Sequence, residues 1–162
     1  KGKIGDISFY KTQDGHLARE KGGVDASRIA NDPAFVRTRE NGAEFGSSAS
    51  SGKVLRDALR TMLMTASDNR VTSRLTKLMT DIKNLDAISV RGLRTVGTAI
   101  ALPTAKALLK GFNFNSKAIL GGVLYKPYAV NTVTGVITIN GLVPINDIAF
   151  PSGSTHVSMK GA

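Results

Sequence analysis

The residues best suited to chemistry include a segment rich in Ser and Gly, GSSASSGKV, at positions 46–54. A phosphate-binding loop needs four residues between its first Gly and the Gly-Lys pair, and then Ser or Thr for magnesium. Here five residues separate Gly46 from Gly52, and Val54 follows Lys53. Such a loop also follows a strand, whereas we expect helices on both sides. The segment therefore predicts no nucleotide site, and we expect no cofactor.

A second pair of motifs, Ser50-x-x-Lys53 and Ser67-Asp68-Asn69, is similar to two signatures of serine β-lactamases and penicillin-binding proteins. The third signature of those enzymes, Lys-Thr-Gly, does not occur in the sequence. A chain of 162 residues is also much smaller than the scaffold that brings those motifs together. We interpret the two motifs as a coincidence.

The remaining candidates for catalysis or metal binding are two histidines and one pair of acids. His16 lies beside a predicted turn and His156 in a predicted terminal strand, so a metal pair or a catalytic triad is not expected. Glu40 and Glu44 share a helix face with nearby arginines, which favours salt bridges. The absence of cysteine excludes thiolate sites and thiol nucleophiles. We therefore expect no catalytic residue, no metal site, no small-molecule substrate and no enzymatic activity.

The strongest compositional signal is basic. The net charge is +10, and every arginine lies between Arg19 and Arg94. If helices align their basic faces, the chain could bind the phosphates of RNA or DNA without sequence preference. The alternative is that these side chains pair with acids of the same chain or of neighbouring copies. The candidate polyanion-binding residues are Arg37, Arg39, Arg56, Arg60, Arg70, Arg74, Lys77, Arg91 and Arg94.

The N-terminal 23 residues predict a β-hairpin. Ile7 and Phe9 alternate with Ser8 and Tyr10, and an Asp-Gly pair at 14–15 supplies the turn. A two-stranded ribbon is marginal alone, so it must lie on the helices or join a sheet of another copy. We therefore interpret residues 1–23 as an arm for assembly, with Ile7, Phe9 and Tyr10 at the contact.

A helical domain is predicted for residues 24–111. Asp32-Pro33 is typical of a helix start. In the helix that follows, Gly42, Gly46 and Ser50 recur every four residues and leave one face almost without side chains. Glycine costs about 1 kcal/mol in a helix, so we expect another element to pack on this stripe and propose it for self-association. The Ser-rich segment 46–52 could instead be a loop.

Further helices should follow in the same domain. Apolar residues from Val71 to Leu85 recur with helical spacing, and this helix should form an antiparallel hairpin with the preceding one. Ser89 can cap a third helix that carries Arg91 and Arg94, and Pro103 begins a short helix that ends at Lys110-Gly111. The segment 24–31 is predicted to be a short linker with one possible helical turn.

Residues 112–162 predict a small β unit. The segment FNFN from Phe112 alternates, residues 128–130 and 136–139 should form two strands around a turn, and HVSM at 156–159 should form another. The chain then ends without an evident partner for that last strand, so we expect truncation or completion by a neighbouring molecule. The complete prediction is an α+β fold with an N-terminal hairpin, an antiparallel bundle of three to four helices and a C-terminal β unit.

Four blocks taken together resemble a widespread family of uncharacterised Bacteroidota proteins. They are KGKIGDISFYKTQDGHLAREKGGV, RIANDPAFVRTRENGAEFG, ASDNRVTSRLT and LLKGFNFN, and they span most of the chain. The resemblance implies a Bacteroidota source and a protein without known enzymatic chemistry. It also implies a chain that continues past residue 162, and it carries over no catalytic residue.

These observations favour a structural protein that self-assembles with copies of itself into a helical tube, filament or shell. The alternative is a nonspecific nucleic-acid-binding protein that uses an arginine-rich helical face, either alone or within a nucleoprotein assembly. No run of 18 apolar residues is present, so no membrane association is expected. The compartment stays undecided, with the cytoplasm favoured because no signal-peptide pattern follows Lys1.

Overall fold

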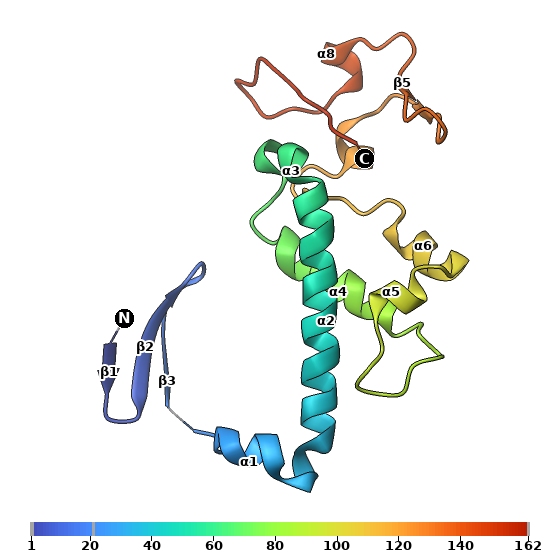
Figure 1. The fold of residues 1–162 in the computed structure, drawn as a ribbon. Helices are drawn as coiled ribbons and strands as arrows, with labels where there is room; N and C mark the ends of the chain where they lie inside the picture. Colours follow the sequence, from blue (N-terminus) through green and yellow to red (C-terminus); the bar gives the residue numbers. More distant parts are fainter. Residues whose placement is uncertain (1, 21, 162) are drawn as a thin grey trace. The chain divides into compact units, whose positions relative to one another are not determined.

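A computed structural model of the protein describes residues 2–20 and 22–161 and confirms the α+β class. By its internal contacts the chain divides into two compact units, residues 1–42 (unit 1) and residues 43–162 (unit 2). The division falls inside one long helix, drawn in Figure 1. The three-part division that we made by element type, at residues 23 and 111, stays a prediction. Lys1 and Lys21 of the predicted hairpin lie outside the described residues.

Unit 1 begins with a three-stranded antiparallel sheet in the order β1–β2–β3. Its strands are β1 (Gly2–Ile4), β2 (Ile7–Thr12) and β3 (Gly15–Glu20). The predicted hairpin is confirmed as β2 and β3, which are joined by the turn at Gln13-Asp14. Strand β1 is an addition that the sequence analysis did not predict. Gly5 has a φ of +56° in the turn between β1 and β2, a conformation that glycine adopts without steric cost.

Unit 1 continues into short helical segments that lead to the long helix. They are α1 (Ala26–Asn31), the 3₁₀ turn η1 (Pro33–Phe35) and the beginning of α2 (Val36–Ala58). The predicted linker is thus largely a helix, which the Asp25 carboxylate caps by accepting from Ser27 N at 2.8 Å. The predicted start at Asp32-Pro33 is confirmed, since Asp32 accepts from Ala34 N at 2.9 Å.

Helix α2 runs without interruption through the Ser-rich segment for 23 residues. The interpretation as a helix is confirmed, and the interpretation as a loop is wrong. The hydroxyl groups of Ser48 and Ser51 donate to the backbone carbonyls four residues earlier, each at 3.0 Å. These bonds satisfy the hydroxyls inside the helix, so they do not compete with its backbone hydrogen bonds.

The core of unit 2 is helical. Its helices are α3 (Arg60–Ala66), α4 (Val71–Lys83), α5 (Val96–Ala99) and α6 (Pro103–Leu109). The predicted apolar face of α4 is confirmed, and the Leu75 and Ile82 side chains on it are fully buried. Buried residues of α5 and α6 complete the cluster, which consists of Leu75, Met79, Ile82, Val96, Ala99 and Ala105.

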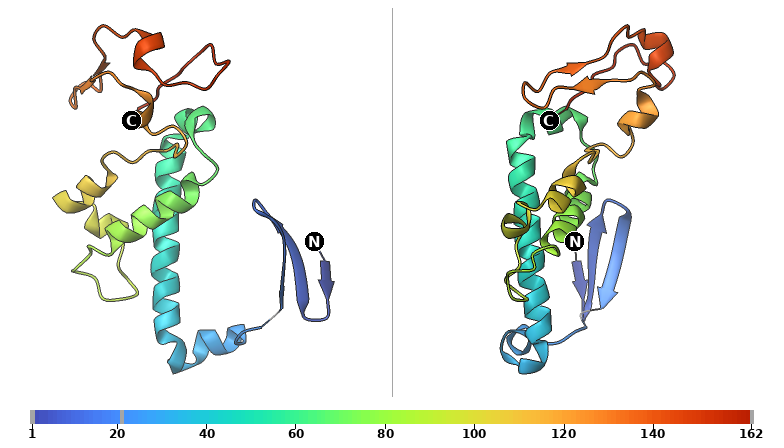
Figure 2. Two further views of the ribbon diagram at one scale, coloured as in Figure 1. Left: turned by 180° about the vertical axis from the view of Figure 1, so that it is seen from behind. Right: turned by 90° about the vertical axis from the view of Figure 1, so that its right-hand side faces the viewer.

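Helices α2 and α4 cross within this bundle-like core, as Figure 1 and the left view of Figure 2 show. Gly52 marks the crossing, because a Cβ at this position would lie 3.6 Å from Leu75 Cγ and 3.7 Å from Met79 Cγ. The two helices contact each other at Gly52 and again through the Glu44–Lys83 ion pair, so the contact is antiparallel in order but is a crossing and not a side-by-side packing along their full length. The prediction of a side-by-side helical hairpin is corrected in this respect.

The segment between α4 and α5 is a loop. We predicted a helix from Ser89 through Arg91 and Arg94, but helix begins only at Val96, where the Thr95 side chain provides the cap. The reason is that buried carboxylates bind the backbone of this segment, as described below. The predicted helix from Pro103 is confirmed as α6, and Gly111 follows it with a φ of +78°.

The C-terminal part of unit 2 contains short elements only. They are α7 (Leu120–Val123), β4 (Ala129–Val130), β5 (Ile137–Thr138) and α8 (Pro144–Asp147). The antiparallel pair β4–β5 confirms two predicted strands in shorter form. The predicted strands at 112–115 and 156–159 are wrong, since neither segment forms a strand. Phe112 and Phe114 instead pack edge to face, with their ring centroids 5.1 Å apart.

Candidate functional site

The sheet of unit 1 carries an apolar face. Residues directly opposite one another in an antiparallel sheet share a face. Ile4 lies opposite Ile7, and Phe9 lies opposite both Gly2 and Ala18. Ile4, Ile7 and Phe9 are 71%, 44% and 42% exposed, so the face is not covered. We call Ile4, Ile7, Phe9 and Ala18 the apolar face of the sheet.

None of the described residues of unit 1 reaches the burial of a core residue. Tyr10, which we grouped with Ile7 and Phe9, lies on the opposite face of the sheet, where it faces Leu17. The Arg19 guanidinium stands over the Tyr10 ring at 5.9 Å from its centroid. The sheet thus has one face with a cation over an aromatic ring, and one face where the apolar residues lie together beside Lys11, His16 and Glu20.

The predicted stripe on α2 is open. Gly42, Gly46 and Ser50 are exposed, and a Cβ at either glycine would find no atom within 4 Å. The face that the chain does bury lies elsewhere on the same helix and consists of Glu44, Ser48 and Gly52. These residues also recur every four positions, which was the signal that could have identified them. Self-association through the open stripe stays a prediction.

The centre of the buried face is an ion cluster around Glu44. Its carboxylate accepts from Lys83 Nζ, from Arg94 Nη2 at 2.7 Å and Nε at 2.8 Å, and from Gly92 N at 2.7 Å. The side chains of Glu44 and Lys83 are 3% and 6% exposed. We predicted that Glu44 would form salt bridges along α2, but only Glu40 does so, with Arg37 at 2.9 Å.

Both oxygen atoms of Glu44 are fully used by these donors. Hydrogen bonds from the Arg94 guanidinium, the Lys83 ammonium and the Gly92 amide hold the pKa of Glu44 well below its usual range. A carboxylate in this state neither gives up a proton near neutral pH nor accepts one readily. The geometry therefore gives Glu44 a structural role, which is to join α2, α4 and the loop before α5.

Asp86 holds the same loop from its other side. Its carboxylate accepts from the backbone N–H groups of Ile88 at 3.1 Å, Ser89 at 3.0 Å and Thr95 at 3.0 Å. The Ser89 amide and the other donors lower the pKa of Asp86 well below its usual range, against the opposing effect of burial. These bonds fix residues 86–95 as a loop and satisfy backbone groups that a helix would otherwise pair.

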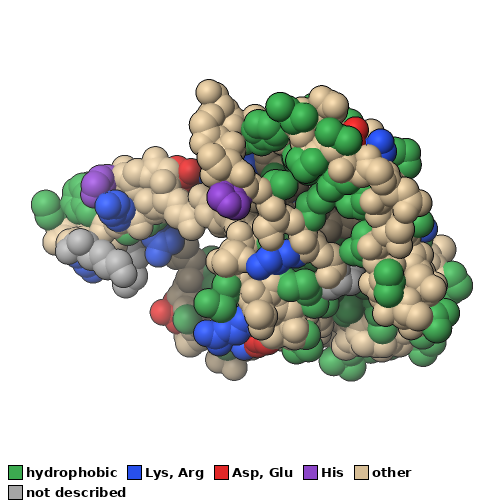
Figure 3. All heavy atoms as spheres, turned by 90° about the horizontal axis from the view of Figure 1, so that it is seen from above, with side chains coloured by type: hydrophobic (Ala, Val, Ile, Leu, Met, Phe, Trp, Pro, Cys, Tyr) green, Lys and Arg blue, Asp and Glu red, His purple; other side chains and the backbone are tan. Residues whose placement is uncertain are grey.

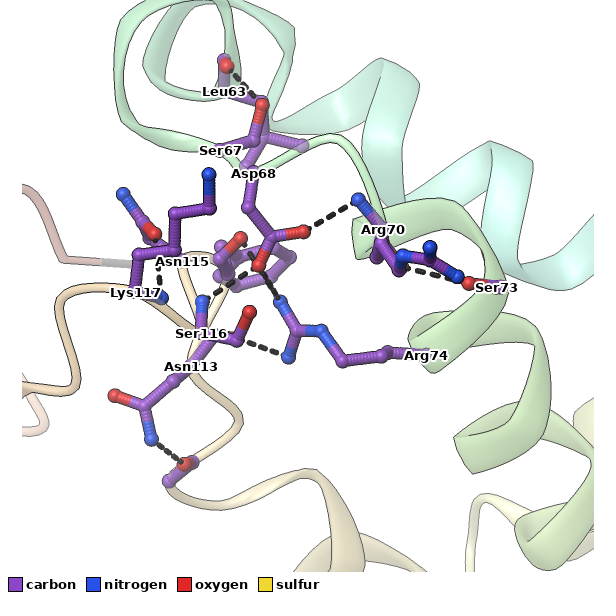
Figure 4. A network of polar contacts seen from close by, with 12 residues as sticks. Leu63, Ser67, Asp68, Arg70, Ser73, Arg74, Asn113, Asn115, Ser116 and Lys117 are labelled. Carbon is purple, nitrogen blue, oxygen red and sulfur yellow. Dashed lines mark hydrogen bonds and ion pairs between the residues drawn. The ribbon is translucent and has the colours of Figure 1, made fainter. Parts of the chain in front are cut away.

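A third carboxylate, Asp68, joins the start of α4 to the segment after α6 (Figure 4). Asp68 accepts from Ser116 N at 2.6 Å, Arg70 N at 2.7 Å and Arg74 Nη2 at 2.6 Å. The Ser116 donors, followed by Arg70 and Arg74, hold the pKa of Asp68 well below its usual range. Arg74 also donates to Asn113 O at 2.7 Å. The motif Ser67-Asp68-Asn69 is thus part of a structural junction.

The predicted polyanion-binding residues are not brought together as one free stripe. Four have carboxylate partners: Arg37 with Glu40, Arg74 with Asp68, Lys77 with Asp81 and Arg94 with Glu44. Arg39 donates to the backbone carbonyls of Ile29 and Asp32. Arg60 is exposed, and Arg56 is half-buried in α2. Arg70 and Arg91 are exposed residues that also have interactions of their own.

The surface of unit 2 carries many hydrophobic side chains, which Figure 3 shows in green. In the C-terminal part, Val133 is 93% exposed and Ile145 is 78% exposed. In the loop that Asp86 and Glu44 hold, Ile88, Val90 and Leu93 are 86%, 69% and 69% exposed. The apolar surface of this chain is therefore distributed over both units.

Within residues 2–20 and 22–161, no three His, Cys, Asp or Glu residues lie close enough to hold a metal ion. None of the helices formed by these residues has the length and apolar character needed to cross a membrane. Comparison of the chain with protein family models, with curated proteins and with solved structures finds no match. The resemblance to a Bacteroidota family stays an expectation from the sequence blocks.

Proposed function

We propose that the protein is a non-enzymatic structural subunit that self-associates into a larger homo-oligomer, such as a helical tube, filament or shell. The observation that carries this proposal is the apolar face of the sheet in unit 1. Ile4, Ile7 and Phe9 share that face at 42–71% exposure, in a unit where no described residue is buried. Apolar faces of this kind in water commonly mark protein interfaces.

The free energy gained by covering the apolar face of the sheet favours association. A small sheet of three strands gains stability when its hydrophobic face packs against another apolar surface. Covering Ile4, Ile7 and Phe9 would contribute about 1 kcal/mol or more for each residue. A sister molecule is the simplest source of a complementary apolar surface, since each copy brings the same face.

Nucleic-acid binding is the second candidate, and a net charge of +10 supports it. The pairing of four of the nine candidate cations with carboxylates weakens it, because paired cations neutralise phosphates less effectively. The ultraviolet absorbance spectrum of purified protein, before and after nuclease, tests whether nucleic acid is bound. Binding that does not weaken steeply as salt is raised would contradict a phosphate interaction.

The self-association proposal is tested with Ile7→Thr combined with Phe9→Thr. Size-exclusion chromatography with light scattering and negative-stain electron microscopy should show particles larger than a monomer for the wild type. The double variant should shift the mass toward the monomer, because the apolar face has lost its two apolar side chains on the central strand β2.

Leu17→Thr is the matched control, since Leu17 is 48% exposed and lies on the opposite face of the same sheet. It should leave the particles largely unchanged. A wild type that stays monomeric up to its solubility limit would overturn the proposed function. Equal effects of the double variant and the control would show that the apolar face is not the contact.

A further inference from the structure

Strand β3 is an edge of the sheet in unit 1, because it is hydrogen-bonded to β2 on one side only. Its sequence, Gly-His-Leu-Ala-Arg-Glu, contains no proline, and its register with β2 contains no bulge. Proline, bulges and inward-pointing charges are the usual means by which edge strands avoid pairing with another strand. Strand β3 lacks proline and a bulge, and its charge on the side of the apolar face, Glu20, stands at its last position, so most of this six-residue edge is suited to pairing.

The hairpin register determines which groups of β3 point outward. Thr12 and Gly15 close the two-residue turn, so they form a hydrogen-bonded pair. Hydrogen-bonded and non-hydrogen-bonded pairs then alternate along the ladder. Counting from the turn, the backbone N–H and C=O groups of His16, Ala18 and Glu20 are directed away from β2. These three residues also share the side of the sheet that carries the apolar face.

We propose that two copies of the protein join through their β3 strands, which pair antiparallel with Ala18 opposite Ala18 of the second copy. This inference rests on the proposed function and specifies one contact within it. In this register all three outward-facing residues of each β3 form hydrogen-bonded pairs, and the Glu20 carbonyl, which accepts from Gly22 N of its own chain at 2.9 Å, accepts a second hydrogen bond from His16 N of the other copy. The two sheets become one sheet of six strands, and both apolar faces lie on the same side of it.

Charge complementarity favours this register. It places His16 of each copy opposite Glu20 of the other, so an imidazole N–H meets a carboxylate at both ends of the contact. Within its own chain His16 lies opposite Lys11, and Glu20 lies opposite Ile7. The carboxylate of the second copy would therefore also offset the charge of Lys11.

The neighbouring two-fold register is less favourable. Shifting one β3 strand by two residues relative to the other would place Leu17 opposite Leu17 of the second copy. That register pairs two outward-facing residues of β3 instead of three. It also places Asp14 opposite Glu20 of the second copy, and like charges directly opposite one another are destabilising.

The pairing is a two-fold contact, so it closes after two copies. A larger assembly then needs a second contact, and the merged apolar face of the six-stranded sheet supplies a surface for it. The β3 contact and the apolar face are thus separable steps, and experiments can address them one at a time.

Single cysteines test the register directly, because the chain has none of its own. In the proposed pairing the two Ala18 Cα atoms lie about 5.5 Å apart, which a disulfide can span. Ala18→Cys should therefore give a disulfide-linked dimer under mild oxidation, read by non-reducing electrophoresis. Arg19→Cys is the control, since its two copies would lie about 8 Å or more apart on the other face.

A charge exchange provides an independent measurement. Glu20→Lys should weaken dimerisation about five- to tenfold, because both His16–Glu20 pairs are replaced by pairs that do not attract. Adding His16→Glu restores opposite charges with reversed polarity and should recover most of the affinity. Sedimentation equilibrium at moderate salt measures both effects.

The outcomes separate this inference from the proposed function. A wild type that assembles, with equal cross-linking of Ala18→Cys and Arg19→Cys and no effect of Glu20→Lys, would overturn the β3 contact alone. A wild type that is monomeric at every concentration would overturn the proposed function and this contact with it. Efficient cross-linking at Ala18 with recovery in the double charge variant supports both.

Discussion

Units 1 and 2 differ in how far they bury their side chains and provide them with partners. Unit 2 buries an apolar cluster around Leu75 and Ile82 and surrounds it with three carboxylates, each held by several donors. Unit 1 has a regular sheet and capped helices, but none of its described residues is buried. Unit 2 therefore contains the interactions that stabilise a domain, whereas unit 1 contains secondary structure whose apolar face still needs a cover.

This difference predicts which substitutions should change the stability of the fold and which should change association. Changes at the buried carboxylates or at the helix crossing should alter the stability of unit 2. Changes on the sheet should alter association and leave the folding of unit 2 almost unaffected. The predictions below test that separation.

Acidification should have the largest effect. The pKa values of Glu44, Asp68 and Asp86 lie below their usual range in the folded chain, so the unfolded chain takes up protons first as the pH falls. Their contribution to stability is fully present above about pH 5 and declines below about pH 4, where unfolded carboxylates protonate. Urea unfolding of unit 2, followed by circular dichroism across this range, measures the decline.

Glu44→Gln is the control for the acid effect. It removes one of the three groups, so the stability of the variant should depend less steeply on pH than that of the wild type. An unfolding free energy that stays constant between neutral pH and about pH 3 would contradict the role of these carboxylates.

Glu44→Ala should have the next largest effect. The change leaves the buried Lys83 and the half-buried Arg94 without their carboxylate, and breaking a buried ion pair in this way costs about 3–5 kcal/mol. Chemical denaturation should show a loss of that size in the free energy of unfolding. Glu40→Ala is matched on the same helix, and its exposed pair with Arg37 should cost about 0.5 kcal/mol or less. Equal losses in the two variants would argue against a buried cluster.

Gly52→Leu should have a moderate effect. The crossing of α2 and α4 has room for a Cβ in ordinary contact with Leu75 and Met79, but a larger side chain must displace them. Overpacking of this kind costs about 1–3 kcal/mol in unfolding free energy. Thermal and urea unfolding of unit 2 measure the loss.

Gly42→Leu combined with Gly46→Leu is the counterpart on the open stripe. No atom lies within 4 Å of a Cβ at either position, so the change should raise helix stability by up to about 1 kcal/mol per residue. The same variant tests the stripe as a contact, because leucine side chains would prevent close approach by another copy. Unchanged particles in electron microscopy would remove the stripe from the proposed self-association surface.

The sequence predicted elements well wherever local patterns determine them. The cap at Asp32 and the apolar repeat of α4 are set by neighbouring residues, and the structure confirms them. The hairpin turn predicted at Asp14-Gly15 is displaced by one residue to Gln13-Asp14. The part of the loop from Ser89 onward was predicted to be helical, because the carboxylate that binds the Gly92 amide, Glu44, is distant in the sequence. A carboxylate that binds backbone N–H groups from another element leaves no periodic signal.

The candidate contact surfaces show the same limit. Alternation in β2 identified Ile7 and Phe9 and already implied that Tyr10 lies on the other face, so grouping Tyr10 with them at one contact was wrong, and the register with β3 shows the separation. Two stripes with a four-residue repeat run along α2, one with Gly42 and Gly46 and one with Glu44 and Ser48. The sequence analysis chose the first as a contact because of its glycines, and the structure leaves that stripe exposed. Which stripe is buried depends on where α4 crosses, and that position is determined by residues of both helices.

The loop at 86–95 has one further consequence. Four of its backbone amides, those of Ile88, Ser89, Gly92 and Thr95, donate to buried carboxylates. The amides of Ile88, Ser89 and Thr95 are held by Asp86 of the loop itself, whereas the Gly92 amide is held by Glu44 of α2. Exchange of the Gly92 amide hydrogen with solvent should therefore follow the separation of this loop from α2, and the other three should report opening within the loop.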